Sequence, residues 1–153
     1  MNVISQMIEA HIFRETSDGI EFLLLKRSEK EIYPGLWQMV NGKISEGEKA
    51  YQTALREIKE ETGIVPEKLW VVPKVDSFYS HENDNIMLLP VFAAQFNFFA
   101  KPIISNEHSE FKWVSPEEAK KLLAWDGQRQ AIDLILNYFK KEINFLNLVE
   151  IKF

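Results

Sequence analysis

Residues 42–64 read GKISEGEKAYQTALREIKEETGI, and this stretch decides how the whole chain is interpreted. Residues 48–62 show helical periodicity, because apolar or small side chains recur at spacings of three and four and predict one buried stripe. The members of that stripe are Tyr51, Ala54, Leu55, Ile58 and Thr62. Gly63, followed by Pro66, predicts the end of the helix.

Three glutamates, Glu57, Glu60 and Glu61, stand at i, i+3 and i+4 on this helix, within an arc of about 100° beside the apolar stripe. Like charges on neighbouring turns repel one another, and only Arg56 is placed to offset them. Taken alone, such a charge run is more often a solvated face than a site. A set of oxygen ligands without histidine or cysteine nevertheless suits a hard cation such as Mg²⁺ or Mn²⁺.

The composition predicts one globular domain over residues 1–153, with 46% hydrophobic and 27% charged residues. The absence of cysteine excludes disulfides, thiolate metal sites and a cysteine nucleophile, and favours a reducing cytoplasm. The net charge of −5 argues against binding of nucleic-acid polymers. The N-terminus has no features of a signal peptide, and no apolar run approaches the ~18 residues of a membrane span, so no membrane association is expected.

Alternation of apolar and polar residues predicts strands at 3–13, 20–26, 69–79, 86–99 and 111–114. A polar turn with positive φ at Gly19 joins the first two strands, and residues 28–43 are expected to form a loop. Pro73 and Pro90 predict sheet edges or strand starts at their positions.

A second helix is predicted to begin at SPEE, residues 115–118, with Ser115 as its N-cap. Asp126 is expected to cap a last helix, whose core face carries Ile132, Ile135, Leu136 and Phe139. Residues 144–153 fit either a terminal strand or an extension. These elements indicate a single α/β (α+β) domain.

The residues on either side of the glutamates are spaced as in the sequence motif of a known family. Gly42 is followed by Glu48 and, seven residues later, by REIKEETGI, so the stretch matches the signature of the Nudix (MutT-like) hydrolases at all nine specified positions. The resemblance implies an α/β/α sandwich with a central mixed sheet. It also implies that the three glutamates bind metal, Mg²⁺ with Mn²⁺ as a substitute, and that Arg56 orients one of them. Glu48 is interpreted as structural, forming a capping box with Ser45.

Two downstream stretches, NEHSEFKWVSPEEAKKL (106–122) and WDGQRQAI (125–132), together with LWQMVNG (36–42), are similar to bacterial dihydroneopterin triphosphate/dATP pyrophosphohydrolases. This similarity implies that Glu107 is a further metal ligand or the general base, and that His108 orients or packs. The function implied is cleavage of a nucleoside-triphosphate-like substrate to the monophosphate and pyrophosphate.

Alternatives remain open. Hydrolysis of a dinucleoside polyphosphate or a nucleotide sugar is one, although Gln38-Met39-Val40-Asn41 stands where dinucleoside tetraphosphate hydrolases usually have proline. A silent domain that senses nucleotides is another, but no signature glutamate is lost. The segment SQMIEAHIF at 5–13 also departs from the basic, proline-containing pattern of the pterin subfamily.

The candidate substrate contacts are Lys26 and Arg27 for phosphates, Tyr33 and Trp37 for ring stacking, Gln38 for a ring edge, and Gly42 in the loop that shapes the site. The expected partners are a small nucleotide or pterin polyphosphate and, in a homodimer, a second copy of the chain.

Overall fold

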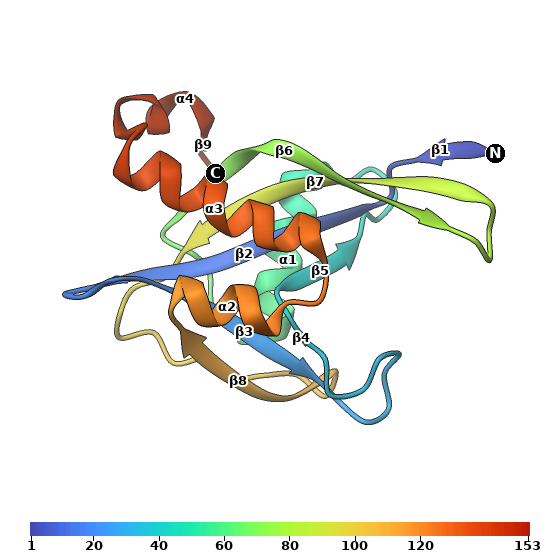
Figure 1. Ribbon diagram of the computed structural model, residues 1–153, viewed down its shortest axis with the longest axis horizontal. Coiled ribbons are helices and arrows are strands. Elements are labelled where there is room, and N and C mark those ends of the chain that lie inside the picture. Colours follow the sequence, from blue (N-terminus) through green and yellow to red (C-terminus); the bar gives the residue numbers. More distant parts are fainter.

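The computed structural model describes residues 1–153, whose elements stack in three layers (Figure 1). The strands are β1 Asn2–Ile4, β2 Met7–Thr16, β3 Gly19–Arg27, β4 Trp37–Gln38, β5 Val40–Lys43, β6 Lys68–Ser80, β7 Asn85–Gln95, β8 His108–Val114 and β9 Glu150–Ile151. Helix α1 (Ala50–Thr62) covers one face of this sheet, and α2 (Pro116–Leu122) and α3 (Asp126–Lys140) cover the other. The predicted α/β/α sandwich is confirmed.

The sheet is mixed, as expected. Its strands run in the order β4-β3-β2-β7-β6-β9, with β1 added to β7, β5 to β2 and β8 to β3. The pairings of β7 with β1 and with β2 are parallel, and the remaining pairings are antiparallel.

The N-terminal strand differs from its prediction. Residues 3–13 were expected to form one strand, but exposed Ser5 and Gln6 separate β1 from β2, and the Gln6 carbonyl instead accepts from the Ile44 N–H at 2.8 Å. Strand β2 also continues to Thr16, into the stretch expected to turn. The turn with positive φ at Gly19 (+124°) is confirmed.

The expected loop over residues 28–43 contains two short strands that the sequence pattern missed. Strand β4 pairs with β3 through Leu25 and Gln38, and β5 pairs with β2 through Ile8 and Gly42. Strands of two and four residues are too short to show alternation, so their signal lies in tertiary pairing.

Helix α1 confirms the predicted helix, although it begins two residues later than expected, at Ala50. The Lys49 N–H before it donates to Gln52 Oε1 at 2.9 Å. Gly63 ends the helix in the left-handed region (φ +73°) and its N–H donates to the Lys59 carbonyl at 2.8 Å, as its position predicted. Of the expected capping box, only the carboxylate half forms, from the Ser45 N–H to Glu48 at 3.1 Å.

Strands β6 and β7 form a long hairpin. Pro73 lies on β6 beyond Leu69 and Trp70, the two residues that pair with β9, so its prediction as an edge position is confirmed. The edge prediction for Pro90 is wrong, because β7 has neighbours on both sides. Pro90 instead lies between the residues of β7 that pair with β1 and those that pair with β2, opposite a register shift in β6.

The C-terminal helices follow their local signals. The Ser115 hydroxyl accepts from the Glu118 N–H at 3.2 Å, which confirms the predicted N-cap of α2. The predicted capping role of Asp126 is wrong: Trp125 precedes α3, and the Asp126 carboxylate, on the first helical residue, faces Gln130 and Arg129. The tail is both helical and extended, with a 3₁₀ turn (Ile143–Phe145), α4 (Leu146–Val149) and β9.

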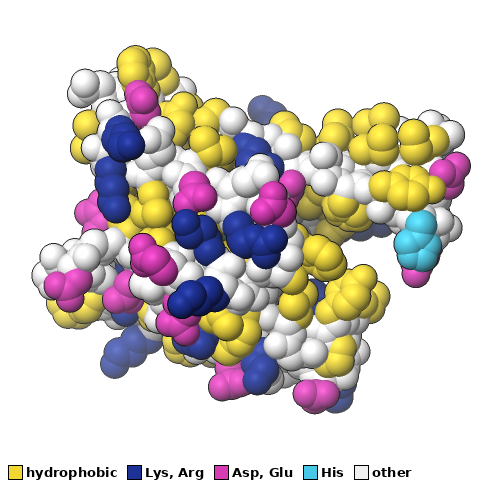
Figure 2. Space-filling view, in the orientation of Figure 1, with side chains coloured by type: hydrophobic (Ala, Val, Ile, Leu, Met, Phe, Trp, Pro, Cys, Tyr) yellow, Lys and Arg dark blue, Asp and Glu magenta, His cyan; other side chains and the backbone are white.

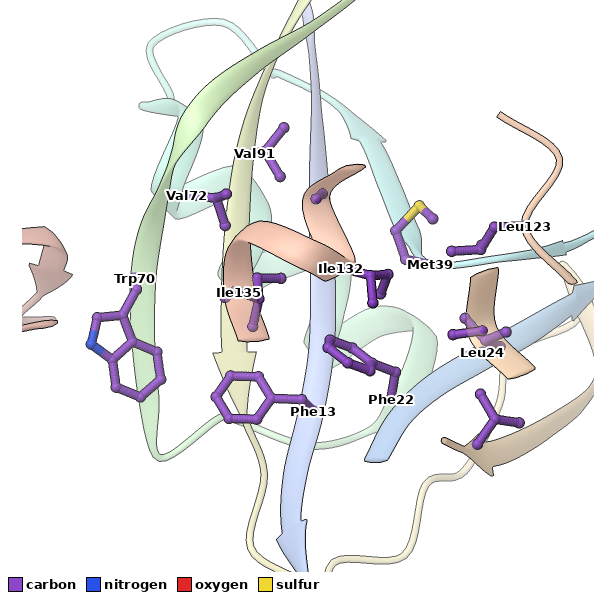
Figure 3. Close-up of a cluster of buried hydrophobic side chains, with 14 residues drawn as sticks. Phe13, Phe22, Leu24, Met39, Trp70, Val72, Val91, Leu123, Ile132 and Ile135 are labelled. Atoms are coloured by element: carbon purple, nitrogen blue, oxygen red, sulfur yellow. The ribbon is translucent and has the colours of Figure 1, made fainter. Parts of the chain in front are cut away.

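Two apolar cores hold the layers together. Between the sheet and α2/α3, Phe13 lies within ring-packing distance of Trp70 (5.8 Å) and Phe139 (4.8 Å), with Ile132 and Ile135 of α3 above (Figure 3). The second core, between the sheet and α1, contains Ala54, Ile58 and alternate residues of β2 and β3. The α1 core therefore brings the glutamate-bearing helix against the sheet.

The visible surface over α2 and α3 mixes basic and acidic side chains, whereas hydrophobic ones gather along the projecting β6–β7 hairpin (Figure 2). None of the helices has the length and apolar character needed to cross a bilayer.

Candidate active site

Helix α1 presents its three glutamates at different depths. Glu61 is buried (4% exposed) and Glu57 is nearly so (15%), whereas Glu60 is largely exposed (58%). The helical phase explains the difference, since Glu57 and Glu61 are four residues apart and both border the stripe that packs on the sheet. The carboxylates therefore line the boundary between core and solvent, as the sequence predicted.

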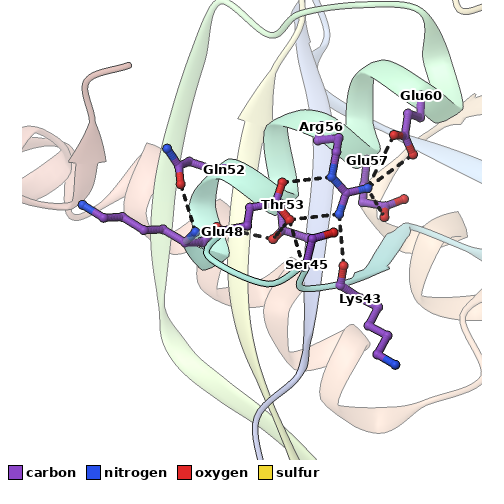
Figure 4. Close-up of polar contacts among 9 residues, drawn as sticks. Lys43, Ser45, Glu48, Gln52, Thr53, Arg56, Glu57 and Glu60 are labelled. Atoms are coloured by element: carbon purple, nitrogen blue, oxygen red, sulfur yellow. Dashed lines mark hydrogen bonds and ion pairs between the residues drawn. The ribbon is translucent and has the colours of Figure 1, made fainter.

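Arg56 organises the polar residues around the start of α1 (Figure 4). Its Nε and one terminal nitrogen donate to the two oxygens of Glu48, at 2.9 and 3.0 Å, and the same terminal nitrogen also donates to the Lys43 carbonyl at 3.0 Å. Its other terminal nitrogen donates to Glu57 at 2.8 Å and lies 3.4 Å from Glu60. The network fixes the Glu57 carboxylate, the task expected of Arg56.

Glu48 belongs to this network and not to the cluster of candidate ligands. Hydrogen bonds from Arg56, and then from the Thr53 hydroxyl at 2.7 Å, lower the pKa of Glu48 from 4.5 to about 2. The hydrogen bond to Glu48 in turn raises the pKa of Arg56 further above its usual range. The pair stays ionised and ties the loop before α1 to the middle of the helix.

Gly42 lies directly beneath the Glu57 side chain. A Cβ atom at residue 42 would lie 2.2 Å from Glu57 Cγ and 2.6 Å from its Oε1. Only glycine leaves space for the carboxylate there, which accounts for the glycine at this position of the motif. The contact links β5 to α1.

Glu61 combines burial with like charge. Its Oε2 atom is buried and has no hydrogen-bond partner. Burial is the main reason that the pKa of Glu61 is raised to about 9, and the negative charges of Glu107, Glu57 and Glu60 raise it further, against an opposing effect of Arg27. Burial also raises the pKa of Glu57.

Glu107 lies near enough to this cluster for its charge to act on it. Its negative charge raises the pKa of both Glu61 and Glu57, so the fold places Glu107 within electrostatic reach of carboxylates up to 50 residues away in sequence. The residue itself is exposed, at the end of the loop that precedes β8. Its carbonyl accepts from the Ser28 N–H at 3.0 Å, which links the loop to the end of β3.

Arg27, Gln38 and His108 form a hydrogen-bonded chain beside Glu107. Arg27 donates to Gln38 Oε1 at 3.1 Å, and the Gln38 amide nitrogen lies 2.8 Å from His108 Nε2. Gln38 and His108 are buried (8% and 5% exposed), and burial, then the charge of Arg27, lowers the pKa of His108 to about 4. The role of His108 as an orienting or packing residue was anticipated, but its bond to Gln38 was not.

The other candidate substrate residues lie elsewhere. Lys26 donates to Glu110 at 2.9 Å, and Trp37 packs on the α2/α3 core with the Lys112 ammonium 4.8 Å from its ring. Because neighbouring strand residues point to opposite faces, Lys26 and Arg27 are separated by the sheet. Tyr33 is exposed (61%), with positive φ (+56°), and its ring meets Trp125 edge-on at 6.1 Å.

The donor set fits a hard divalent cation. It consists of carboxylates, one of which has a buried oxygen without a partner, and their mutual repulsion is offset only by Arg56 and Arg27. No three acidic side chains already stand close enough together to hold an ion.

Comparison with known proteins is consistent with this geometry. The model of the NUDIX domain matches residues 7–135. The asymmetrical bis(5'-nucleosyl)-tetraphosphatase of Caenorhabditis elegans is 30% identical over 112 residues, covering 72% of this chain and 79% of that protein. The dihydroneopterin triphosphate diphosphatase of Escherichia coli is 30% identical over 135 residues, covering 76% and 83%.

A solved NUDIX hydrolase structure from Listeria monocytogenes superposes with a TM-score of 0.77 at 25% identity, covering 90% of this chain and 95% of that one. The similarity to other relatives covers less of their length. This chain spans 28% of the Myxococcus xanthus octanoyltransferase and 60% of the Cereibacter sphaeroides RNA pyrophosphohydrolases that it resembles.

Proposed function

This chain belongs to the Nudix family of hydrolases, and we propose that it is a Mg²⁺-dependent pyrophosphohydrolase of a nucleoside-triphosphate-like substrate. The products are the monophosphate and pyrophosphate, and the substrate is dATP, another nucleoside triphosphate or dihydroneopterin triphosphate. The observation that supports the proposal is the Glu61 Oε2 atom of the motif, which is buried without a hydrogen-bond partner while the negative charges of Glu57 and Glu107 act on the same carboxylate.

In this proposal Glu57, Glu60 and Glu61 hold the metal, and Glu107 is a further ligand or the general base. Mg²⁺ bound there would neutralise phosphate oxygens and acidify a water for attack on phosphorus. Arg56 keeps the Glu57 carboxylate in position, and Gly42 leaves the space in which it stands. Arg27, whose charge already acts on Glu61, is the proposed contact for the phosphate chain.

A second candidate is hydrolysis of a dinucleoside polyphosphate. It is favoured by the C. elegans tetraphosphatase, which is as similar in sequence as the pterin enzyme. Both candidates use the same carboxylates and differ in what lies beyond the phosphates, where Tyr33 and Trp125 offer exposed rings. We also propose a cytoplasmic location, which the cysteine-free composition favours, and a small free substrate rather than a nucleic-acid polymer.

A substrate panel tests the proposal. The purified protein is incubated with Mg²⁺ and, separately, dATP, other nucleoside triphosphates, dihydroneopterin triphosphate, diadenosine tetraphosphate and ADP-ribose, and the products are resolved by ion-exchange chromatography. We expect pyrophosphate and a monophosphate from a triphosphate, with no product in excess EDTA. Preferential cleavage of the tetraphosphate would favour the second candidate, and turnover of no substrate would contradict both.

A further inference from the structure

Glu107 lies in a turn directly before β8. The negative charges of the nearby glutamates make this an unfavourable position for its own charge. Glu107 is exposed, and its negative charge acts on the carboxylates of Glu57 and Glu61. An unrestrained glutamate in such a loop would swing into water, because like charges repel and solvent is available. Something other than its own side chain must keep it facing α1.

The residue that follows Glu107 supplies the restraint. His108 is buried, and its Nε2 lies 2.8 Å from the amide nitrogen of Gln38, on β4. Gln38 is in turn fixed by Arg27, which donates to its Oε1 at 3.1 Å. Arg27 is itself held by a hydrogen bond from its Nε to the Ile32 carbonyl. The chain thus ties the first residue of β8 to the ends of β3 and β4.

The direction of each hydrogen bond follows from the chemistry of the three groups. Arginine can only donate, so the oxygen of Gln38 must face Arg27 and its NH₂ group must face His108. His108 Nε2 is therefore the acceptor, and the ring proton sits on Nδ1. Both polar ends of the Gln38 side chain are used, so the amide is held in one orientation between Arg27 and His108.

We propose that Arg27, Gln38 and His108 form a brace that positions Glu107 against the carboxylates of α1, with Gln38 and His108 as positioning residues that touch neither substrate nor metal. The proposal rests on the proposed function, because it assigns Glu107 a part in the metal site. The brace acts together with the bond from the Ser28 N–H to the Glu107 carbonyl.

The test uses His108→Leu, which removes the acceptor, and His108→Gln, whose side-chain oxygen has nearly the reach of Nε2. Affinity for Mn²⁺ is measured from the EPR signal of the free ion, and kcat and KM are measured for dATP or for the substrate that the panel identifies. We expect His108→Leu to weaken Mn²⁺ binding and lower kcat by about 10- to 100-fold with little change in KM, and His108→Gln to recover most of both.

The decisive comparison repeats the His108→Leu measurement in a chain that already carries Glu107→Gln. If the brace works through Glu107, His108→Leu should lower kcat and Mn²⁺ affinity by less than about twofold when Glu107 is already replaced. An undiminished effect of His108→Leu in that background would overturn the proposal, as would wild-type behaviour of His108→Leu in the intact chain.

Folding and the proposed function are controlled separately. Thermal unfolding of each variant is recorded, and Gln38→Leu breaks the same hydrogen bond from the other side should His108→Leu not fold. Gln95→Leu replaces a half-buried glutamine of β7 and should leave kcat and Mn²⁺ affinity unchanged. A Glu57→Gln variant that loses activity, beside a fully active His108→Leu, contradicts the brace alone. A wild-type chain that binds no Mn²⁺ and cleaves nothing contradicts the proposed function.

Discussion

Glu60 is the most exposed of the three helix glutamates, and its carboxylate lies 3.4 Å from Arg56 at the rim of the site. As a proposed metal ligand, Glu60 should matter far more for activity than its exposure suggests. We expect Glu60→Gln to lower kcat with Mg²⁺ by at least ~100-fold, because loss of a charged ligand removes several kcal/mol of stabilisation. Glu15→Gln, an exposed glutamate of β2, is the matched control. Full activity of Glu60→Gln would remove this residue from the metal site.

Gly42 permits a second residue-scale prediction. An added Cβ must displace the Glu57 side chain, since the nearest atom would be only 2.2 Å away. Misplacing a reacting group by about 1 Å can lower the rate ~100-fold, so Gly42→Ala should reduce kcat strongly. Stopped-assay kinetics and a thermal melt distinguish this from unfolding. A Gly42→Ala variant with wild-type kcat would show that the Glu57 position is not critical.

At this scale the sequence predicted the parts of the site that lie close together in the chain. Arg56 and the three glutamates lie within six residues of one helix, so helical phase alone places them relative to one another. The bond between Gln38 and His108 could not be predicted, because it spans 70 residues and depends on β4, a strand of two residues that no local pattern announces.

Helix α1 is held at its N-terminal side by an ion pair that should respond to acid. The pKa of Glu48 is about 2 when folded and 4.5 ordinarily, so the ionised form is the one that stabilises the fold. That contribution is complete above about pH 4.5 and is lost as the pH falls toward 2. Urea unfolding of wild type and Glu48→Gln should therefore differ at pH 7 and converge below pH 4.5. A difference in the free energy of unfolding between the two proteins that stays constant with pH would contradict an ionic origin of the stabilisation.

Elements with strong local signals were predicted well. Helix α1 is marked by its stripe of apolar residues and by Gly63 at its end, and α2 is marked by Ser115 followed by Pro116 at its start. The break between β1 and β2, the strands β4 and β5, and the interior place of Pro90 could not be predicted, because each depends on which strands become neighbours. Local sequence signals therefore predict that a helix or strand forms, whereas the ends of the strands depend on how they pair in the sheet.

Across the whole molecule, the sheet separates the aromatic core around Phe13 from the carboxylates of the candidate site. Phe13 is fully buried on the α3 face of β2, between Trp70 and Phe139, while the carboxylates lie on the α1 side. We expect Phe13→Ala to lower the free energy of unfolding by about 3–5 kcal/mol, and the melting temperature by on the order of 10 °C.

Calorimetry measures the stability loss of Phe13→Ala, and kinetics at low temperature measure its activity. Because the side chain is remote from the carboxylates, kcat of the folded fraction should stay near that of wild type. The milder Phe13→Leu should give a smaller loss of stability with the same kcat. A kcat that falls in step with stability would show that the two faces are coupled.

The pairing of β3 (Gly19–Arg27) with β8 (His108–Val114) has a consequence for how the chain matures. Glu107 comes near α1 only when this contact between distant segments has closed, and pairing between distant segments is slow because the loop-closure entropy must be lost first. Partly folded chains will hold the Nudix helix without its fourth carboxylate. On the proposed assignment of Glu107, we therefore expect the metal site to be complete only once β3 and β8 have paired.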